Sequence, residues 1–172
     1  ASPGGNLTPL SPERYPLVYQ HQAGVIDYTD LRKLIEETLT LPDPELAETV
    51  ESEIMVDEYL QYLAALAAIQ DHDQVRKNYY LYRDPAGDAG WRVLPWDLDL
   101  TFGHLWSEEN DVLEERIVSD ADIFVGAYDP ARGGFYNQLT ERVLRIPSYR
   151  ARFRAQVEQM LDTTMTRSEA NM

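Results

Sequence analysis

The sequence KNYYLYRDP at residues 77–85, followed by WRVLPWDLDLTFG at residues 91–103, decides the architecture of this chain. Both runs contain aromatic and branched apolar residues of the kind found in strands. The residues that join them, DPAGDAG at 84–90, are turn formers. The pattern predicts a β-hairpin, with strands at 78–83 and 91–94, that ends in the acidic sequence Pro95-Trp96-Asp97-Leu98-Asp99.

Apolar residues at helical spacing surround the hairpin on both sides. Before the hairpin they predict three helices, with N-terminal signals at Thr29 and Asp30, at Asp43-Pro44 and at Asp57. After it they predict one helix through Phe135, Leu139 and Val143 and another after Pro147. Residues 1–16 hold four of the ten prolines and predict an irregular lead-in, with a short strand at 17–20. The expected fold is α+β and mostly helical, with residues 17–172 as one domain part around a central hairpin.

The composition is globular and strongly acidic. The chain has 172 residues, with 15 Lys plus Arg against 30 Asp plus Glu, which gives a net charge of −15. This excess of acid argues against nucleic acid as a partner and suits a protein that gathers cations. No apolar run reaches the length of a membrane helix, so we expect no membrane partner. The chain opens with ASPGG, without a basic leader or a start methionine, and is expected to be a piece of something longer.

Several kinds of active site are excluded by missing residues. There is no cysteine, so the chain has neither a thiol nucleophile nor a cysteine zinc cluster. There is no P-loop, no Gly-x-Gly-x-x-Gly and no Gly-x-Ser-x-Gly. The three histidines are far apart, which argues against a zinc hydrolase.

Charge is unevenly distributed along the chain. Residues 43–58 carry seven acids and no base, whereas residues 142–154 carry five arginines and no acid. The favoured interpretation is two solvated helix faces that touch each other. The alternative for the arginines is a site for an acidic partner or a phosphopeptide.

Two short patterns carry candidate chemistry. Asp73 and Asn78 have the Asp-x-x-x-x-Asn spacing of a phosphoryl-transfer catalytic loop, and Asp71 competes with Asp73 for the acidic position. Asp97 and Asp99 stand two residues apart, so on a strand both would face one cation. The hairpin would join these patterns into a magnesium-nucleotide site, although an Asp after a strand more often caps a turn. The tyrosines and tryptophans of the hairpin are expected to pack a sheet face rather than stack on a base.

The run from Lys77 to Pro85 and the string Pro-Trp-Asp-Leu-Asp-Leu-Thr-Phe-Gly at 95–103 resemble the signature of the CotH family, the spore-coat protein H-like kinases. The resemblance extends over about Tyr28 to Asp162 and includes Leu144-Arg145-Ile146-Pro147-Ser148-Tyr149-Arg150. It implies an atypical protein-kinase fold that transfers the γ-phosphoryl group of ATP to serines of secreted or coat proteins, with Mg²⁺ or Mn²⁺. It also implies a bacterial protein that is secreted, on the cell surface or in the spore coat.

The same resemblance assigns roles to the patterned residues. Asp73 matches the catalytic-loop aspartate, the candidate base. Asn78 and Asp97 match residues that hold metal and nucleotide, and Asp99 matches a supporting metal ligand or an orienting acid.

The chain departs from a kinase in lacking a nucleotide-clamping lysine on a strand. Lys33 lies on a predicted helix and Lys77 lies in the catalytic loop itself. The chain therefore resembles the C-terminal, catalytic-loop half of the domain, without the N-terminal nucleotide clamp, and weak or absent activity is expected from it alone. The alternative is a non-catalytic module in which the acids bind Ca²⁺ or Mg²⁺ to hold the fold of a coat or surface protein. A glycoside hydrolase ranks below both, because Asp97 and Asp99 do not come from separate elements.

Overall fold

The computed structural model describes residues 5–24, 26–71, 77–86, 90–107, 112–115, 122–124, 127 and 137–165. The helices are η1 (Pro12–Arg14), α1 (Tyr15–Val18), α2 (Thr29–Thr40), α3 (Asp43–Glu53), α4 (Val56–Ala68), α5 (Gln138–Arg145), α6 (Pro147–Met160) and η3 (Leu161–Met165). The strands are β1 (Tyr79–Tyr82), β2 (Arg92–Pro95), β3 (His104–Ser107) and β4 (Val112–Glu115). The fold class is α+β, as the sequence predicted.

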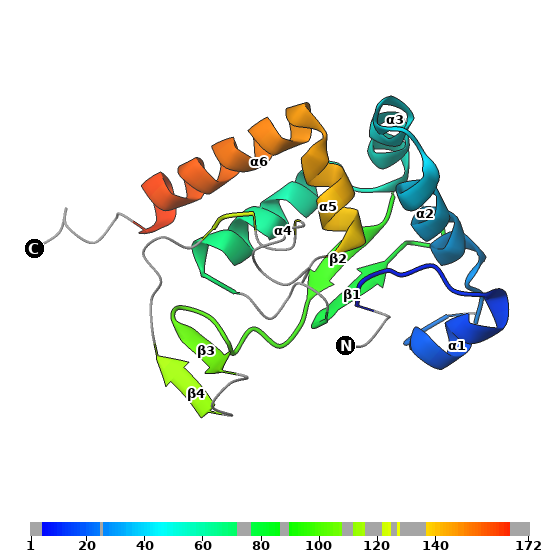
Figure 1. Cartoon of the computed structure of the whole chain (residues 1–172), viewed down its shortest axis with the longest axis horizontal. Coiled ribbons are helices and arrows are strands. Elements are labelled where there is room, and N and C mark those ends of the chain that lie inside the picture. Colours follow the sequence, from blue (N-terminus) through cyan, green and yellow to red (C-terminus); the bar gives the residue numbers. More distant parts are fainter. Residues whose placement is uncertain are drawn as a thin grey trace, which may run out of the picture.

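Helix α4 lies at the centre of the molecule. It packs against α6 on one side and against β2 on the other (Figure 1). Its alanines and leucines favour a helix, and Leu60 and Ala64 have no exposed surface. The small side chain of Ala64 lets neighbouring elements approach closely, and strand β2 of the hairpin packs against α4.

The β1–β2 hairpin is tied to the junction between α3 and α4 by its own backbone. The N–H of Trp91 donates to Glu53 O at 2.7 Å, and the N–H of Met55 donates to Trp91 O at 2.9 Å. Gly90 makes this approach possible, because a Cβ there would lie 2.6 Å from the carbonyl carbon and oxygen of Glu53. The position of the second strand is therefore fixed by a contact that only glycine permits.

The predicted helices are present, with shifted starts. The side chain of Asp27, rather than Thr29 or Asp30, accepts the N–H of Thr29 at 2.8 Å where α2 begins. Helix α3 has Pro42 at its N-cap, one residue before the predicted Asp43. Asn137 caps α5 by accepting the N–H groups of Leu139 and Thr140 at 3.0 and 3.2 Å.

Two parts of the chain differ from the sequence expectation. Residues Pro12–Val18 are helical rather than irregular or extended, and Tyr15 within them is fully buried. The proline-rich start is therefore part of the core. The antiparallel pair β3–β4 was not predicted, because its acidic residues Glu114 and Glu115 interrupt any apolar alternation.

The acidic and basic stretches touch, as the favoured interpretation held. Arg142 of α5 lies 3.4 Å from Asp43, and Arg152 of α6 lies 3.1 Å from Glu51 and pairs with Asp57. These contacts join α5 and α6 to α3 and the start of α4. None of the helices within the described ranges has both the length and the apolar composition that a membrane crossing requires.

Candidate functional site

The register of the β1–β2 hairpin brings two of the predicted site residues to the same end. The two runs form the predicted hairpin, in which Tyr79 pairs with Pro95 and Tyr82 with Arg92. The next pair continues the ladder, because the N–H of Trp96 donates to Asn78 O at 2.8 Å. Asn78 accepts this last hydrogen bond of the hairpin, and Asp97 directly follows its donor, Trp96.

Both residues have an unusual backbone conformation. Asn78 has φ of 63° and Asp97 has φ of 59°, in the left-handed region that costs an L-residue roughly 1–2 kcal/mol. Asn and Asp tolerate this region better than other residues with a side chain. Backbone strain of this kind collects at functional sites, where the surrounding structure holds it in place. The turns at Asn78 and Asp97 therefore mark this end of the hairpin as a candidate site.

A second anchor ties the Asp97–Asp99 segment to the end of α4. The N–H of Phe102 donates to Ile69 O at 2.7 Å, and Thr101 beside it is 8% exposed. The segment is thus held at one end to Ile69 and at the other to Asn78. These two anchor residues bracket residues 70–77, the stretch that contains both candidate catalytic acids.

Of those two acids, Asp73 lies outside the described residues. Asp71 is described, is 1% exposed, and its N–H donates to Leu66 O at 2.9 Å. Burial raises the pKa of the nearby Tyr62 hydroxyl, with further contributions from Tyr59 and Tyr79 and then from the charge of Asp71. Such deep burial suits a residue that holds the loop rather than one that meets a substrate.

The strand argument for Asp97 and Asp99 was wrong. Strand β2 ends at Pro95, and both aspartates are exposed in the irregular segment that follows. Period-two alternation therefore does not set where their side chains lie. Within the described ranges, no three His, Asp or Glu side chains gather closely enough to hold a metal ion. The donor types still fit one, since carboxylate and amide oxygens of Asp97, Asp99 and Asn78 are the ligands that Mg²⁺ prefers.

The aromatic residues of the hairpin are divided between its two faces. Leu81, Trp91 and Val93 pack against the core, and Tyr79 donates its hydroxyl to Gly5 O at 2.6 Å. The opposite face is exposed: Tyr80 is 38% exposed and Trp96 is 59% exposed, with their rings 5.8 Å apart in an edge-to-face arrangement. Packing thus accounts for one face only, and the other leaves an aromatic surface beside Asp97.

Lys33 does not lie on a strand, where a nucleotide-clamping lysine is expected. Lys33 lies on α2, as predicted, where its ammonium group is 2.6 Å from Glu53. Glu53 also lies 3.4 Å from Arg83, so these residues form an ion-pair cluster that joins α2, α3 and the residue after β1. Within the described part of the chain, Lys33 therefore has a structural role, because its ion pair links two helices.

These observations describe an α+β protein in which Asn78 and Asp97, both in a left-handed backbone conformation, lie at one end of a hairpin. The sequence PWDLDLTFG at 95–103 leads away from that end. A sequence model of the family described as "CotH kinase protein" matches residues 5–172. The chain belongs to the CotH family. It is also 30% identical over 137 residues to the inner spore coat protein H of Bacillus subtilis (strain 168). That match covers 79% of this chain but 33% of the relative, so the chain spans about a third of its length.

Proposed function

We propose that this chain is the catalytic-loop half of a CotH-type protein serine kinase that acts on coat proteins. One observation carries the proposal: backbone hydrogen bonds from Trp96 to Asn78 and from Phe102 to Ile69 hold the Asp97–Asp99 segment against both ends of the 70–77 stretch. Phosphoryl transfer needs a base, a metal-binding amide and a metal-binding carboxylate near one another. Membership of the CotH family supports the kinase part of the proposal, and the coat-protein relative supports the coat part.

In the proposed reaction the hydroxyl oxygen of a substrate serine attacks the γ-phosphorus of ATP. The bond from that phosphorus to the β–γ bridging oxygen breaks, and ADP leaves with the electron pair. Asp73 accepts the hydroxyl proton. Asn78 and Asp97 would hold Mg²⁺ or Mn²⁺, with Asp99 in support, and the metal would neutralise charge on the phosphate oxygens.

In this proposal, other residues position the loop and offer a surface for the nucleotide. Buried Asp71 and left-handed Gln70, which has φ of 55°, fix where the loop leaves α4. The exposed rings of Tyr80 and Trp96 offer an apolar surface next to the phosphate end, suited to a nucleotide base. A clamping lysine is missing from this set, so weak transfer is expected from these residues alone.

The test is a calorimetric titration of Mg-ATP and Mn-ATP into the chain and into Asp97→Asn. We expect binding of wild type and a loss of about tenfold or more in affinity for Asp97→Asn. Glu48→Gln is the matched control, since it removes the same charge from an exposed position on α3. Equal affinity for wild type and Asp97→Asn would contradict the role of Asp97.

Thermal melting separates the proposal from the non-catalytic alternative. If the acids bind a metal only to hold the fold, Mg²⁺ or Ca²⁺ should raise the melting temperature and ATP should add nothing. If they form a metal-nucleotide site, ATP with metal should raise it further than metal alone, because only a ligand of the folded state stabilises that state. The absence of any ATP effect, together with no binding by calorimetry, would overturn the kinase proposal for this chain.

A further inference from the structure

The side chain of Tyr79 connects the hairpin to two other parts of the chain. Its hydroxyl donates to Gly5 O at 2.6 Å and accepts a hydrogen bond from Nδ2 of Asn137 at 2.9 Å. The same Nδ2 donates to Gly5 O at 3.0 Å. These three groups form a closed triangle of hydrogen bonds, the Tyr79 triangle, at which β1, the start of α5 and the N-terminal segment meet (Figure 1).

Asn137 uses the whole hydrogen-bonding capacity of its side-chain amide. It is 5% exposed, and its Oδ1 caps α5 by accepting the N–H groups of Leu139 and Thr140. Its Nδ2 makes two of the contacts in the Tyr79 triangle. An amide offers two donors and two acceptor positions, so all four are used. Capping needs only the acceptor, which Ser, Thr or Asp would supply as well. The two donors therefore have a role beyond the cap.

The other two corners of the Tyr79 triangle are also held in place. Burial raises the pKa of Tyr79 above its ordinary value, so its hydroxyl keeps its proton and remains a donor at neutral pH. Gly5 is followed by two residues with defined contacts. The N–H of Gln138 donates to Asn6 O at 3.4 Å, and Leu7 is 5% exposed in the core. The acceptor at Gly5 therefore has a fixed place in the fold.

The Tyr79 triangle bears directly on Asn78, the residue before Tyr79. Asn78 has a left-handed φ of 63°, and such a conformation persists where the surrounding structure holds it. On one side, Asn78 O accepts the N–H of Trp96 at 2.8 Å. On the other side, the chain continues into Tyr79, whose side chain is fixed at its far end. A rotation at Asn78 would therefore break the bond to Trp96 or move the Tyr79 hydroxyl out of the triangle.

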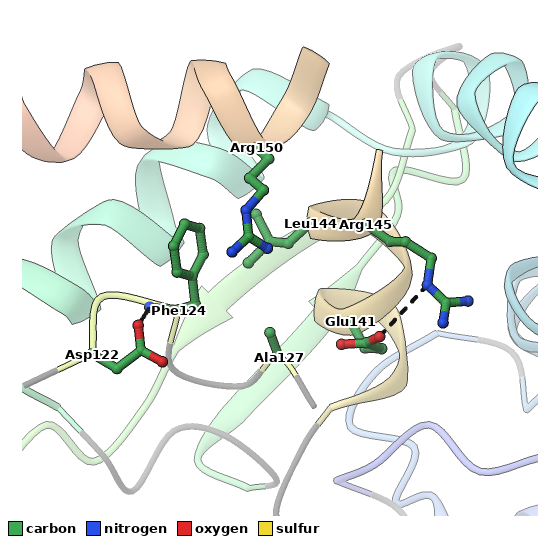
Figure 2. A pocket seen from close by; sticks show the side chains of 7 residues that line it. All are labelled: Asp122, Phe124, Ala127, Glu141, Leu144, Arg145 and Arg150. Carbon is green, nitrogen blue, oxygen red and sulfur yellow. Dashed lines mark hydrogen bonds and ion pairs between the residues drawn. The ribbon is translucent and has the colours of Figure 1, made fainter. Parts of the chain in front are cut away.

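This contact belongs to the start of α5 and is separate from the rest of that helix. One turn after Asn137, the side chain of Glu141 lies 3.7 Å from Arg145 and lines a cavity of about 260 Å³ (Figure 2). Neither Asn78 nor Tyr79 is among the described residues that line this cavity. The cavity is therefore separate from the contact by which Asn137 reaches the hairpin.

We propose that Asn137 is a positioning residue: through the hydroxyl of Tyr79, it fixes the place and the left-handed conformation of Asn78. The consequence for binding rests on the proposed function, in which Asn78 holds the metal ion. Asn137 and Tyr79 touch neither metal nor nucleotide in this proposal and act through the backbone of their neighbour. Residues that orient a metal ligand commonly control the affinity of the site. Loss of the triangle should therefore weaken metal-nucleotide binding although every proposed ligand remains.

The first measurement is amide hydrogen exchange of the whole chain by NMR, in wild type, Tyr79→Phe and Asn137→Ser. Phe keeps the ring and removes the hydroxyl, whereas Ser keeps a cap for α5 and removes both donors. Exchange at the amide of Trp96 is compared with exchange at that of Leu60 in α4. We expect this ratio to rise about fivefold over wild type in each variant. The readout needs no ligand, so it tests the placement of Asn78 by itself.

The second measurement is the affinity for Mn-ATP by calorimetry. We expect Tyr79→Phe and Asn137→Ser each to bind Mn-ATP about fivefold or more weakly than wild type. Unchanged affinity in both variants would overturn the positioning role in binding. If wild type itself bound no Mn-ATP, the proposed function would fail, and the exchange at Trp96 would still decide whether Asn137 places Asn78.

The matched control is Tyr59→Phe. Tyr59 is 4% exposed, and its hydroxyl lies 2.8 Å from Oγ1 of Thr140 on α5. This variant also removes a buried tyrosine hydroxyl that contacts α5, but it leaves the Tyr79 triangle intact. We expect Tyr59→Phe and Tyr79→Phe to lower the melting temperature by similar amounts, about 2–4 °C. Tyr59→Phe should keep the Mn-ATP affinity within about twofold of wild type, with the exchange ratio at Trp96 unchanged. Equal effects of the two substitutions on that ratio would overturn the proposal in favour of a general loss of stability.

Discussion

The backbone N–H of Trp96 donates to the carbonyl oxygen of Asn78 at 2.8 Å, one step beyond the last pair of the β1–β2 ladder. This bond brings together two parts of the sequence that lie on either side of a turn. The chain leaves the sheet at the next residue, Asp97, which adopts a left-handed backbone conformation with φ of 59°. The hairpin therefore delivers Asn78 and Asp97 to one place through its backbone, independently of what their side chains bind.

Phe102 provides a test of strain at the second anchor. It has φ of 52° and a side chain that is 59% exposed, so the left-handed conformation is not compensated by burial. Replacement with glycine keeps the N–H that donates to Ile69 O and removes the steric cost. We expect Phe102→Gly to be more stable than Phe102→Ala by about 1 kcal/mol in urea unfolding.

The comparison with alanine is the control, because both variants lose the same exposed ring and differ mainly in the backbone preference. If Phe102→Ala proved as stable as Phe102→Gly, the left-handed conformation at this position would carry no cost. If ATP binding survived in both, the aromatic ring of Phe102 would not be required by the site.

Gly90 should tolerate no side chain. A methyl group there would lie 2.6 Å from backbone atoms of Glu53, and backbone cannot move aside as a flexible side chain does. We expect Gly90→Ala to lower the free energy of unfolding by about 1–3 kcal/mol and to speed hydrogen exchange at the amide of Trp91.

Gly24 is the contrasting position for this measurement. It has φ of +87°, but among the described residues a Cβ there would meet only the ring of His21, at 3.9 Å. Gly24→Ala should therefore cost about 1 kcal/mol from backbone preference alone. Equal costs for the two substitutions, with unchanged exchange at Trp91, would contradict the close approach at Gly90.

Much of the scaffold could be predicted from the sequence, because the relevant signals are local. Apolar spacing indicated helices α2 to α6, and turn formers between aromatic runs indicated the hairpin. The burial of Tyr15 could not be predicted, since it depends on how Tyr19, Tyr28 and Arg32 fold back against its ring. The same is true of the bond from Phe102 to Ile69, which has no counterpart in sequence pattern.

The candidate site shows the same division. The Asp73–Asn78 spacing and the Asp97–Asp99 pair were visible in the sequence, and the register of the hairpin brings Asn78 and Asp97 to one end. The strand conformation assumed for Asp97 and Asp99 was wrong, because β2 ends at Pro95. A proline at the end of a strand is a warning against that assumption, since it lacks the N–H for further pairing.

Arg142 should matter far more for stability than its neighbour Arg145. Its Nε donates to Thr38 O at 2.9 Å, and a second nitrogen donates to Leu41 O, so it satisfies carbonyls at the end of α2. We expect Arg142→Met to cost about 1.5–3 kcal/mol in thermal or urea unfolding. Arg145→Met should cost less than about 1 kcal/mol, because Arg145 forms a surface ion pair with Glu141, one turn away on the same helix. Similar losses in both would argue against the capping role of Arg142.

Titration of Tyr149 should lower the free energy of unfolding at high pH. Its hydroxyl is 3.0 Å from Ala47 O and 3.0 Å from a carboxylate oxygen of Glu51. Burial, with a further contribution from Glu51, raises the pKa of Tyr149 to about 12, whereas an unfolded tyrosine titrates near 10. Between these values the folded chain keeps the proton and the unfolded chain loses it. The contribution of this tyrosine is therefore fully present below pH 10 and is lost as the pH rises toward 12.

Tyr149→Phe should isolate that contribution. At pH 7 to 9 we expect the variant to be less stable than wild type by about 1 kcal/mol, by a constant amount, because it lacks the hydroxyl hydrogen bonds. From about pH 10 to 12 the wild type should lose stability faster than the variant, since phenylalanine has no proton to lose. Urea unfolding at intervals of pH measures the difference directly. A difference that stays constant up to pH 12 would show that this hydroxyl titrates alike in the folded and unfolded chains.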